Sequence, residues 1–297
     1  MTSYQEHLLT SWLIYSTAAL FFELLVSRSG CVLLCGATFF AIGSYSTVYW
    51  GAQWTDVLFA SLVASFLSMT LVVPLWYSMR ALEQDERALV SFGLQAVVFS
   101  LCLNWRAATG GVYGRSVPVL GGTESDGVEN ADMVLCYSIT LLASTIMFVK
   151  WMRSSCIGRL ALAAATEAEW VTLAGGNVSS LQLVYLAIGA AGIAFAGAIN
   201  AHSVGFVDAS LASLDQSVAL LAMSLVGQRI GLWGPLVGAS IVVVLPESLR
   251  LIGVTNSVSA HVRQIICALA IVTGTCDLRV LLVAVSRTRA LCARARR

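Results

Sequence analysis

Hydrophobic residues in this chain form long runs that are separated by short polar stretches. A helix needs about 20 residues to cross roughly 30 Å of hydrocarbon. The pattern therefore predicts about nine membrane-spanning helices, near 8–26, 31–50, 56–78, 88–104, 132–151, 179–200, 209–227, 232–252 and 262–285. The two weakest are 88–104, which is short, and 209–227, which reaches full length only with Asp215 and has a re-entrant segment as its alternative.

The composition places the chain in the same class. Hydrophobic residues make up 58% and charged residues 11% of its 297 positions, so it is far more apolar than a soluble domain. We expect an all-α polytopic membrane protein with one transmembrane domain over 1–297 and with its first hydrophobic segment retained as a span. The formal net charge of +1 offers no basic surface, so nucleic acid is not an expected partner.

Residues able to carry chemistry are sparse. The single lysine, Lys150, is not part of a GxxxxGK[ST] motif, so the chain has no phosphate-binding loop of that type and we expect no cofactor in it. The eight cysteines lie mostly in apolar runs without metal-ligand spacing, which is typical of small buried side chains. The three histidines are too few and too scattered to indicate an enzyme or a metal site.

Positive charge predicts the orientation, because the cytoplasmic loops of membrane proteins carry an excess of Lys and Arg. With nine crossings, most of the 17 Lys and Arg residues fall on the cytoplasmic side, including an Arg-rich tail at about 286–297. The N-terminus and the loop 105–131 are then outside, and the loop 152–178 is cytoplasmic. The arginines left outside are Arg106, Arg115, Arg250 and Arg263.

The loop 152–178 contains an unusual polar segment. Residues 158–176 are Ala-rich, which favours a helix, and end in a glycine pair typical of a helix stop. A helix that lies on lipid headgroups would present Lys and Arg, whereas this one offers Glu167 and Glu169 with only Arg159. We interpret the segment as one short helix that binds a cytoplasmic protein. An inert connector and an interfacial helix are the alternatives.

The same segment resembles a known family. GRLALAAATEAEWVTLAGGNV (158–178) is similar to the coupling loop GRALxAIRExExAAxxxGINV in the permease subunits of bacterial branched-chain amino acid ABC importers, the LivM/LivH group. Four more stretches resemble this family in the same order: SGCVLLCGATFFAIGSY (29–45), TGGVYG (109–114), AGIAFAGAINAHSVGFV (191–207) and VGQRIGLWGPLVGASIVVVLPESLR (226–250). Together the five stretches cover about 29–250.

The resemblance implies a permease that has one broken helix and a cytoplasmic coupling helix, and that performs no bond chemistry itself. Cytoplasmic ATPase subunits would bind the ATP and dock on the coupling helix. The residues expected to couple the chain to them are Gly158, Arg159, Glu167, Ala168 and Gly175. The broken segment supplies candidates for the translocation path, because irregular backbone in a membrane is tolerated against a cavity or within protein. These are Gly30, Phe39, Gly43 and Tyr45.

The resemblance also implies further partners and a location. A second permease subunit, identical or related, would complete the path in the bacterial inner membrane. An extracytoplasmic solute-binding protein would deliver the substrate. The substrate stays open among branched-chain amino acids, urea and short amides. This chain differs from the family in three of the motifs. Leu33, Leu34, Cys35 and Gly36 replace SLGH, Gln228 and Ile230 stand at glycine positions of GGRGT, and Trp170, Val171 and Thr172 replace AAE in the coupling loop.

Two other functions are alternatives. An ion- or proton-coupled secondary transporter would place paired carboxylates or polar clusters at mid-membrane. Only Glu23 comes close to such a position, and its nearness to Arg28 also fits a simple ion pair. A diverged membrane scaffold without transport activity would need no ATPase partner.

Overall fold

The computed structural model describes residues 3–31, 33–49, 54–117, 127–227, 231–251 and 256–275. Helices account for nearly all of these residues, which confirms the prediction of an all-α polytopic membrane protein. The described strands, β1 (Arg115–Ser116) and β2 (Phe206–Val207), form one short antiparallel pair in which Arg115 lies opposite Val207. This pair joins two loops at one end of the bundle.

Six helices of the described chain are long and apolar enough to cross a membrane. They are α1 (Ser3–Ser29), α3 (Trp54–Met79), α4 (Gln84–Asn104), α6 (Gly127–Ser154), α9 (Val178–Val204) and the run formed by η4 (Gly231–Trp233), α11 (Gly234–Ala239), the π-turn η5 (Ser240–Val244) and α12 (Leu245–Leu251). The short predicted span 88–104 is thus a long helix, α4. α13 (Asn256–Thr275) covers the first part of the last predicted span, and the rest of that span lies outside the described residues.

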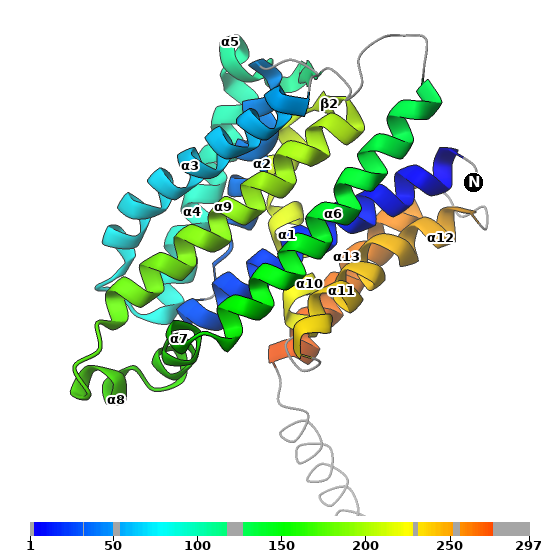
Figure 1. Cartoon of the computed structure of the whole chain (residues 1–297). Coiled ribbons are helices and arrows are strands. Elements are labelled where there is room, and N and C mark those ends of the chain that lie inside the picture. Colours follow the sequence, from blue (N-terminus) through cyan, green and yellow to red (C-terminus); the bar gives the residue numbers. More distant parts are fainter. Residues whose placement is uncertain are drawn as a thin grey trace, which may run out of the picture.

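The centre of the bundle is formed by α1 and α9, which pack along each other (Figure 1). α3 packs on α9, whereas α6 and α11 pack on α1. Gly189 and Gly192 of α9 face Leu25 and Phe21 of α1 so closely that a Cβ atom at either glycine would overlap those side chains. Small residues therefore allow the two central helices to approach each other.

In two of the predicted spans, a short α-helix follows irregular chain or a 3-10 turn. In the segment 31–50, irregular chain leads to α2 (Gly36–Ser46), which is followed by η1 (Thr47–Tyr49). In the segment 209–227, the short 3-10 turn η3 (Ala209–Ala212) precedes α10 (Leu214–Gly227). The broken helix predicted for the first segment is present, and the second segment contains a similar interruption.

Both half-helices begin at the middle of the bundle. Gln95 lies midway along α4, and its Oε1 atom accepts a hydrogen bond from the backbone N–H of Thr38 in the first turn of α2, at 3.0 Å. The amide of the same side chain donates to the carbonyl of Ala212 at the end of η3. The Oγ of Ser217, in the first turn of α10, donates to Oε1 of Gln95 at 3.1 Å. The first turns of α2 and α10 therefore meet at mid-depth.

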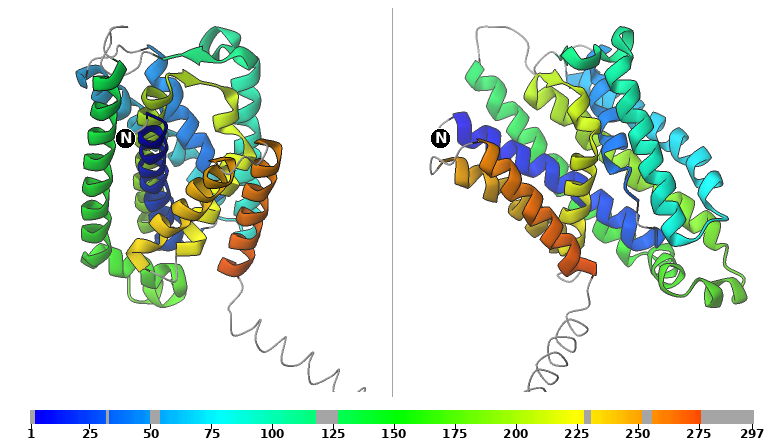
Figure 2. Two further views of the ribbon diagram at one scale, coloured as in Figure 1. Left: turned by 90° about the vertical axis from the view of Figure 1, so that its right-hand side faces the viewer. Right: turned by 180° about the vertical axis from the view of Figure 1, so that it is seen from behind.

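The chain repeats one arrangement in two opposite directions (Figure 2). The elements α1 to α4 follow the order long central helix, irregular chain with half-helix, and two further helices. The elements α9 to α13 follow the same order, but α9 runs opposite to α1 and α10 runs opposite to α2. Inverted repeats of this kind, with interrupted helices meeting at the midplane, are a common plan of transporters.

The loops are sorted between the two ends of the bundle (Figure 1). The start of α1, α5 (Arg106–Thr109), η2 (Gly111–Tyr113) and the β1–β2 pair lie at one end. α7 (Cys156–Thr166), α8 (Ala168–Leu173) and the end of α13 lie at the other. This matches the predicted grouping of the N-terminus with 105–131, opposite 152–178. The tail 286–297 lies outside the described residues, and the assignment of the two ends to the two sides of a membrane stays a prediction.

Candidate functional site

The predicted docking loop lies beyond the end of the bundle, as α7 and α8 (Figure 1). The Oγ of Ser155 accepts a hydrogen bond from the backbone N–H of Gly158 at 3.0 Å, which caps the start of α7. The loop ends at Gly175, whose φ of +83° is a left-handed conformation that glycine adopts without strain. The glycine stop predicted from the sequence is therefore confirmed.

The prediction of one helix over 158–176 is wrong, because the segment is two helices. Glu167 separates α7 from α8 with φ −142° and ψ 75°, which is not a helical conformation. Just before it, the hydroxyl of Thr166 donates to the carbonyl groups of Leu162 and Ala163, at 3.1 Å each. Such local bonds from Thr to the backbone compete with helix continuation.

One face of α7 packs on the bundle and the other is exposed. Gly158, Ala161 and Ala164 form the buried face. The other predicted coupling residues, Arg159, Glu167, Ala168 and Gly175, are all exposed. On α8, the Trp170 and Leu173 side chains are 69% and 80% exposed. The loop thus presents a mixed apolar and polar surface, which suits contact with another protein.

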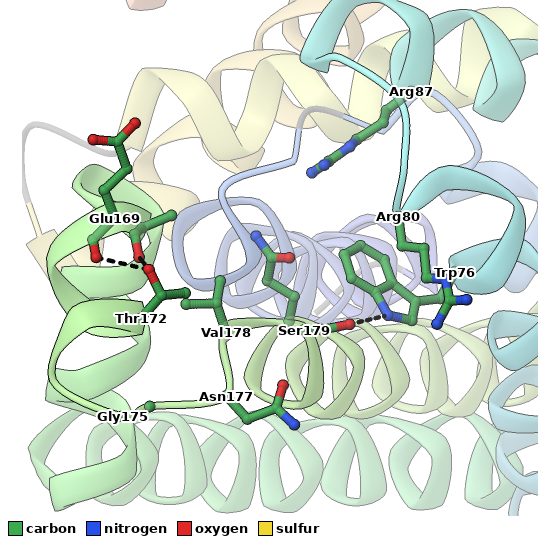
Figure 3. Close-up of a pocket in the computed structure, with 12 residues that line it drawn as sticks. Trp76, Arg80, Arg87, Glu169, Thr172, Gly175, Asn177, Val178 and Ser179 are labelled. Carbon is green, nitrogen blue, oxygen red and sulfur yellow. Dashed lines mark hydrogen bonds between the residues drawn. The ribbon is translucent and has the colours of Figure 1, made fainter.

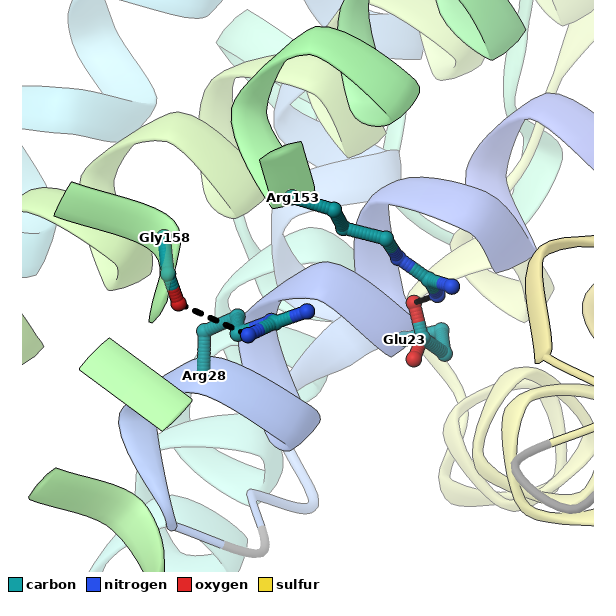
Figure 4. A network of polar contacts seen from close by, with 4 residues as sticks. All are labelled: Glu23, Arg28, Arg153 and Gly158. Carbon is teal, nitrogen blue, oxygen red and sulfur yellow. Dashed lines mark hydrogen bonds and ion pairs between the residues drawn. The ribbon is translucent and has the colours of Figure 1, made fainter. Parts of the chain in front are cut away.

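A buried polar network connects this loop to α1 (Figure 4). The Arg28 side chain, near the end of α1, donates from Nη1 to the carbonyl of Gly158 at 2.7 Å. One turn earlier, the carboxylate of Glu23 forms an ion pair with Arg153 at the end of α6. Glu23 is only 4% exposed. The ion pair predicted between Glu23 and Arg28 is therefore corrected, since the partner of Glu23 is Arg153.

Gly30 lies directly under the docking loop. It follows α1 with φ +68°, and a Cβ atom built on it would lie 3.1 Å from Cα of Ala165 in α7. Gly30 was predicted to belong to the translocation path, whereas the structure places it against the coupling helix. The two predicted sites therefore meet at the point where α1 turns into irregular chain.

The other predicted path residues pack inside the chain. Phe39 is 1% exposed and belongs to the main hydrophobic core. Gly43 faces the backbone of Ala194 in α9 without room for a Cβ atom. Tyr45 is half-buried and packs against the cluster formed by Ala41, Cys102, Ala209 and Ala212. Within this chain these residues contact neighbouring helices, and their place in a path between two permease subunits stays a prediction.

The junction of the half-helices is held by amide and hydroxyl groups that the sequence analysis did not single out. The Oγ atom of Ser217 accepts from the backbone N–H of Ala37, and Ser91 accepts from that of Leu34, at 2.9 Å each. Gln95 completes the junction from α4. These side chains satisfy backbone groups that lack helical partners in an apolar interior. A signal was available, because Ser91 and Gln95 are polar residues inside an apolar span.

Two of the cavities lined by the described residues lie outside this junction. A cleft of about 780 Å³ opens beside the docking loop, between the turn that joins α3 to α4 and the start of α9 (Figure 3). An apolar groove of about 620 Å³ crosses the bundle surface between α3 and α6. Among the described residues, no group of three or more His, Cys, Asp or Glu side chains has the arrangement of a metal site.

Comparisons with known proteins agree with this architecture. A family model described as the permease component of branched-chain amino acid transport systems matches residues 4–272. The high-affinity branched-chain amino acid transport system permease protein LivM of Salmonella typhimurium (strain LT2) is 24% identical over 269 residues, which cover 81% of this chain and 62% of that protein. The chain thus spans less than two thirds of this relative's length. No solved structure matches the chain.

Proposed function

Because the chain belongs to the family of permease components of branched-chain amino acid transport systems, we propose that it forms part of the translocation path of an ATP-driven importer. The match over 4–272 carries this proposal. The family is one of transport permeases and not of enzymes. We propose a branched-chain amino acid, or a related small polar solute such as urea or a short amide, as the substrate. The LivM relative, a permease protein of a high-affinity branched-chain amino acid transport system, supports this choice.

The proposed partners follow from the two ends of the bundle. Two cytoplasmic ATPase subunits would dock, one on α7 and α8 of this chain and one on the same loop of a second permease subunit. A solute-binding protein would deliver substrate to the opposite end. A second permease subunit, identical or related, would complete the path in the bacterial inner membrane. The N-terminus would be outside and the docking loop cytoplasmic. The exposed side chains of α8, including Trp170 and Leu173, support a protein contact there.

The coupling mechanism uses the contacts beneath α7. Closure of the ATPases would push on α7, which touches the end of α1 through Arg28 and Gly30. From Gly30 the chain continues as irregular backbone to α2 and the Gln95 junction. A ligand shifts a two-state equilibrium by binding the two states unequally. ATP would therefore bias the permease between outward-open and inward-open states through this route.

A secondary transporter is the second candidate, and the mid-depth junction disfavours its proton-coupled form. The side chains that meet there, of Thr38, Ser91, Gln95 and Ser217, are amides and hydroxyls that do not ionise. Proton-coupled transport requires groups that titrate, usually carboxylates facing a cavity. Glu23 is buried in an ion pair near the docking loop instead.

Reconstitution with candidate partners tests the proposal. The permease is purified with two ATPase subunits, placed in vesicles with the binding protein, and assayed for uptake of leucine, urea and acetamide. We expect uptake to require ATP. Ala168→Arg on exposed α8 should release the ATPases or abolish substrate-stimulated hydrolysis, whereas Ala168→Ser, which keeps a small side chain at the same exposed position, should retain both. Uptake that proceeds without ATP and follows an ion gradient would favour the secondary transporter.

A further inference from the structure

The cleft beside the docking loop is rich in hydrogen-bond donors (Figure 3). Arg80 comes from the turn after α3, and Arg87 from the first turns of α4. Across from them lie polar side chains around the start of α9, namely Asn177, Ser179 and Gln182. The indole of Trp76 forms part of the wall and donates to Oγ of Ser179 at 3.3 Å. The cleft therefore combines two positive charges and the carboxylate of Glu169 with neutral polar groups.

The guanidinium group of Arg87 is held in place facing the cleft (Figure 3). Its Nε donates to the carbonyl of Leu82 at 2.9 Å, and its Nη1 lies 3.2 Å from Sγ of Cys31. Its plane also lies 5.7 Å from the centre of the Trp76 ring. These contacts leave Nη2 without a partner among the described residues. Arg87 is therefore pre-positioned to bind an anion, since guanidinium groups match phosphate oxygens well.

The carboxylates nearest to the two arginines along the chain, Glu83, Asp85 and Glu86, lie at the start of α4 and form no ion pair with either arginine. Arg80 stacks on Tyr77 at 5.0 Å, and neither arginine has a carboxylate partner in the described part of the chain. Glu83 and Glu86 form a capping box at the start of α4, in which the carboxylate of each residue accepts a hydrogen bond from the backbone N–H of the other. Glu169 is the carboxylate that lines the cleft, and it lies on the far wall from the arginines (Figure 3).

The helix α9 adds to the attraction for an anion. This helix has 27 residues, and its first residues, Val178 and Ser179, line the cleft. The unpaired N–H groups at a helix start carry a partial positive charge. Asn177 uses its side-chain oxygen to bind the N–H of Ser180 at 3.1 Å, which leaves the N–H groups of Val178 and Ser179 to other partners. The two arginines and the helix start therefore act on the same space.

The cleft lies where apolar helix surface gives way to polar chain. On the bundle side of Arg80 and Arg87, α3 and α4 expose apolar side chains, with Tyr77 57% exposed and Leu89 69% exposed. Acyl chains would cover such surfaces, and a headgroup attached to them would reach the level of the arginines. A soluble anion would gain nothing from these apolar faces. The arrangement thus fits a molecule that has both a phosphate and acyl chains.

We propose that this cleft binds the phosphate of an anionic phospholipid, with Arg80 and Arg87 as the charged contacts. Basic pockets between transmembrane helices are suited to such headgroups. The bound lipid would tie the start of α9, and with it α8, to the turn between α3 and α4. Lipid binding does not depend on the proposed transport role, so the two proposals fail separately.

Native mass spectrometry of the purified chain tests the proposal. Detergent-solubilised protein is mixed with phosphatidylglycerol or phosphatidylcholine, and the retained lipid is measured. We expect the wild type to prefer phosphatidylglycerol. Arg80→Gln or Arg87→Gln should weaken this binding roughly fivefold, and the double variant about 25-fold. Lys150→Gln is the matched control, because Lys150 is exposed on α6 at the same end but outside the cleft.

A variant that is expected to strengthen lipid binding distinguishes the loss of a binding site from a folding defect. Glu169 is exposed, so Glu169→Gln should fold normally and, by removing the carboxylate of the cleft, strengthen phosphatidylglycerol binding about two- to fivefold. Unchanged retention in both the double variant and Glu169→Gln would overturn the proposal, as would an equal loss in Lys150→Gln.

Two further arms separate the lipid from other anions and from a protein. Displacement of phosphatidylglycerol by inorganic phosphate at about 10 mM would identify a site for soluble phosphate and refute the lipid assignment. If the double variant kept the lipid but lost the ATPase subunits, the cleft would be a protein-docking surface. We expect phosphate to leave the lipid bound, and the ATPases to remain attached to the double variant.

Discussion

Gly30 and Ala165 are in contact, although one belongs to the broken segment after α1 and the other to the coupling helix α7. A Cβ atom on Gly30 would lie 3.1 Å from Cα and 3.3 Å from the carbonyl oxygen of Ala165. The adjacent bond from Arg28 to the carbonyl of Gly158 fixes the same pair of elements. α7 thus contacts α1, which is distant along the chain, as well as α6, α8 and α9.

Gly30→Ala should weaken coupling more than its effect on stability alone explains. Gly30 and Gly231 both have positive φ angles, of +68° and +77°. An alanine at either position should cost about 1 kcal/mol in backbone strain. Only at Gly30 would the new methyl group also displace α7, because nothing lies within 4 Å of a Cβ atom at Gly231. The measurements are the thermal midpoint and the substrate-stimulated ATP hydrolysis of the assembled transporter.

Gly231→Ala serves as the matched control for that experiment, because Gly231 lies in η4, outside α7 and α8. Both variants should lower the thermal midpoint by a few degrees, while Gly30→Ala alone should reduce the stimulation of ATP hydrolysis severalfold. Equal stimulation of ATP hydrolysis in the two variants would show that the contact between Gly30 and Ala165 does not couple the ATPases to the bundle.

Glu23→Gln should destabilise the chain strongly. The change removes the charge that pairs with Arg153 and leaves a guanidinium group that is only 18% exposed. Removing one partner of a buried pair typically costs about 3 kcal/mol. Arg263 and Asp215 form an exposed pair, with exposed side-chain fractions of 38% and 49%, so Arg263→Gln should cost less than about 1 kcal/mol. Thermal unfolding in one detergent compares the two, and similar losses would contradict the buried role of Glu23.

The long helices could be predicted from the sequence, because an apolar run of about 20 residues has few alternatives in a membrane. The interruption at 209–227 could not be predicted in the same way. A full span and a half-helix preceded by a turn can have the same mean hydropathy, so hydropathy does not distinguish them. The break at Glu167 was also missed, because the Ala-rich composition around it favours an unbroken helix. It depends on one residue's backbone conformation, which composition does not report.

The candidate site was only partly predictable for a different reason. The glycine stop at Gly175 is local and was found. The role of Gln95 depends on partners 57 and 122 positions away, Thr38 and Ser217, which the folded bundle brings together. Likewise, the packing of Gly30 on α7 depends on where the coupling loop folds back. Single-sequence patterns describe neighbours along the chain and leave such long-range contacts undetermined.

Gln95→Met should loosen the mid-depth junction. Methionine has a similar size, but it removes the acceptor for two groups of Thr38 and for the hydroxyl of Ser217. Each buried group left unsatisfied costs about 1 to 3 kcal/mol. We expect a large drop in the thermal midpoint, together with faster hydrogen exchange at the start of α2. Asn104→Met is the control, since that amide is exposed and bonds only to Ser100. A wild-type midpoint for Gln95→Met would refute the junction.

Gly43→Ala should separate α2 from α9. A methyl group at this position overlaps the backbone of Ala194, which cannot rotate away as a side chain does. Overpacking of this kind costs about 1 to 3 kcal/mol. Gly93→Ala in α4 is the matched control, because Gly93 is exposed with nothing within 4 Å of its added Cβ atom. That change should be neutral or stabilise the helix by about 0.5 to 1 kcal/mol. Thermal unfolding of both variants decides, and equal stability would contradict the close approach.

The last prediction concerns the sidedness of the two ends. Tyr113 is 83% exposed at the end that holds β1, and Leu173 is 80% exposed on α8 at the other. Single-cysteine variants at these positions, in a chain without its native cysteines, should react differently with a membrane-impermeant maleimide. In intact cells Tyr113→Cys should be labelled and Leu173→Cys should not, because the excess of Lys and Arg places the docking loop in the cytoplasm. Permeabilised cells provide the control, since both variants should then be labelled. Labelling of Leu173→Cys from outside would invert the topology and would place α7 and α8 out of reach of any cytoplasmic ATPase.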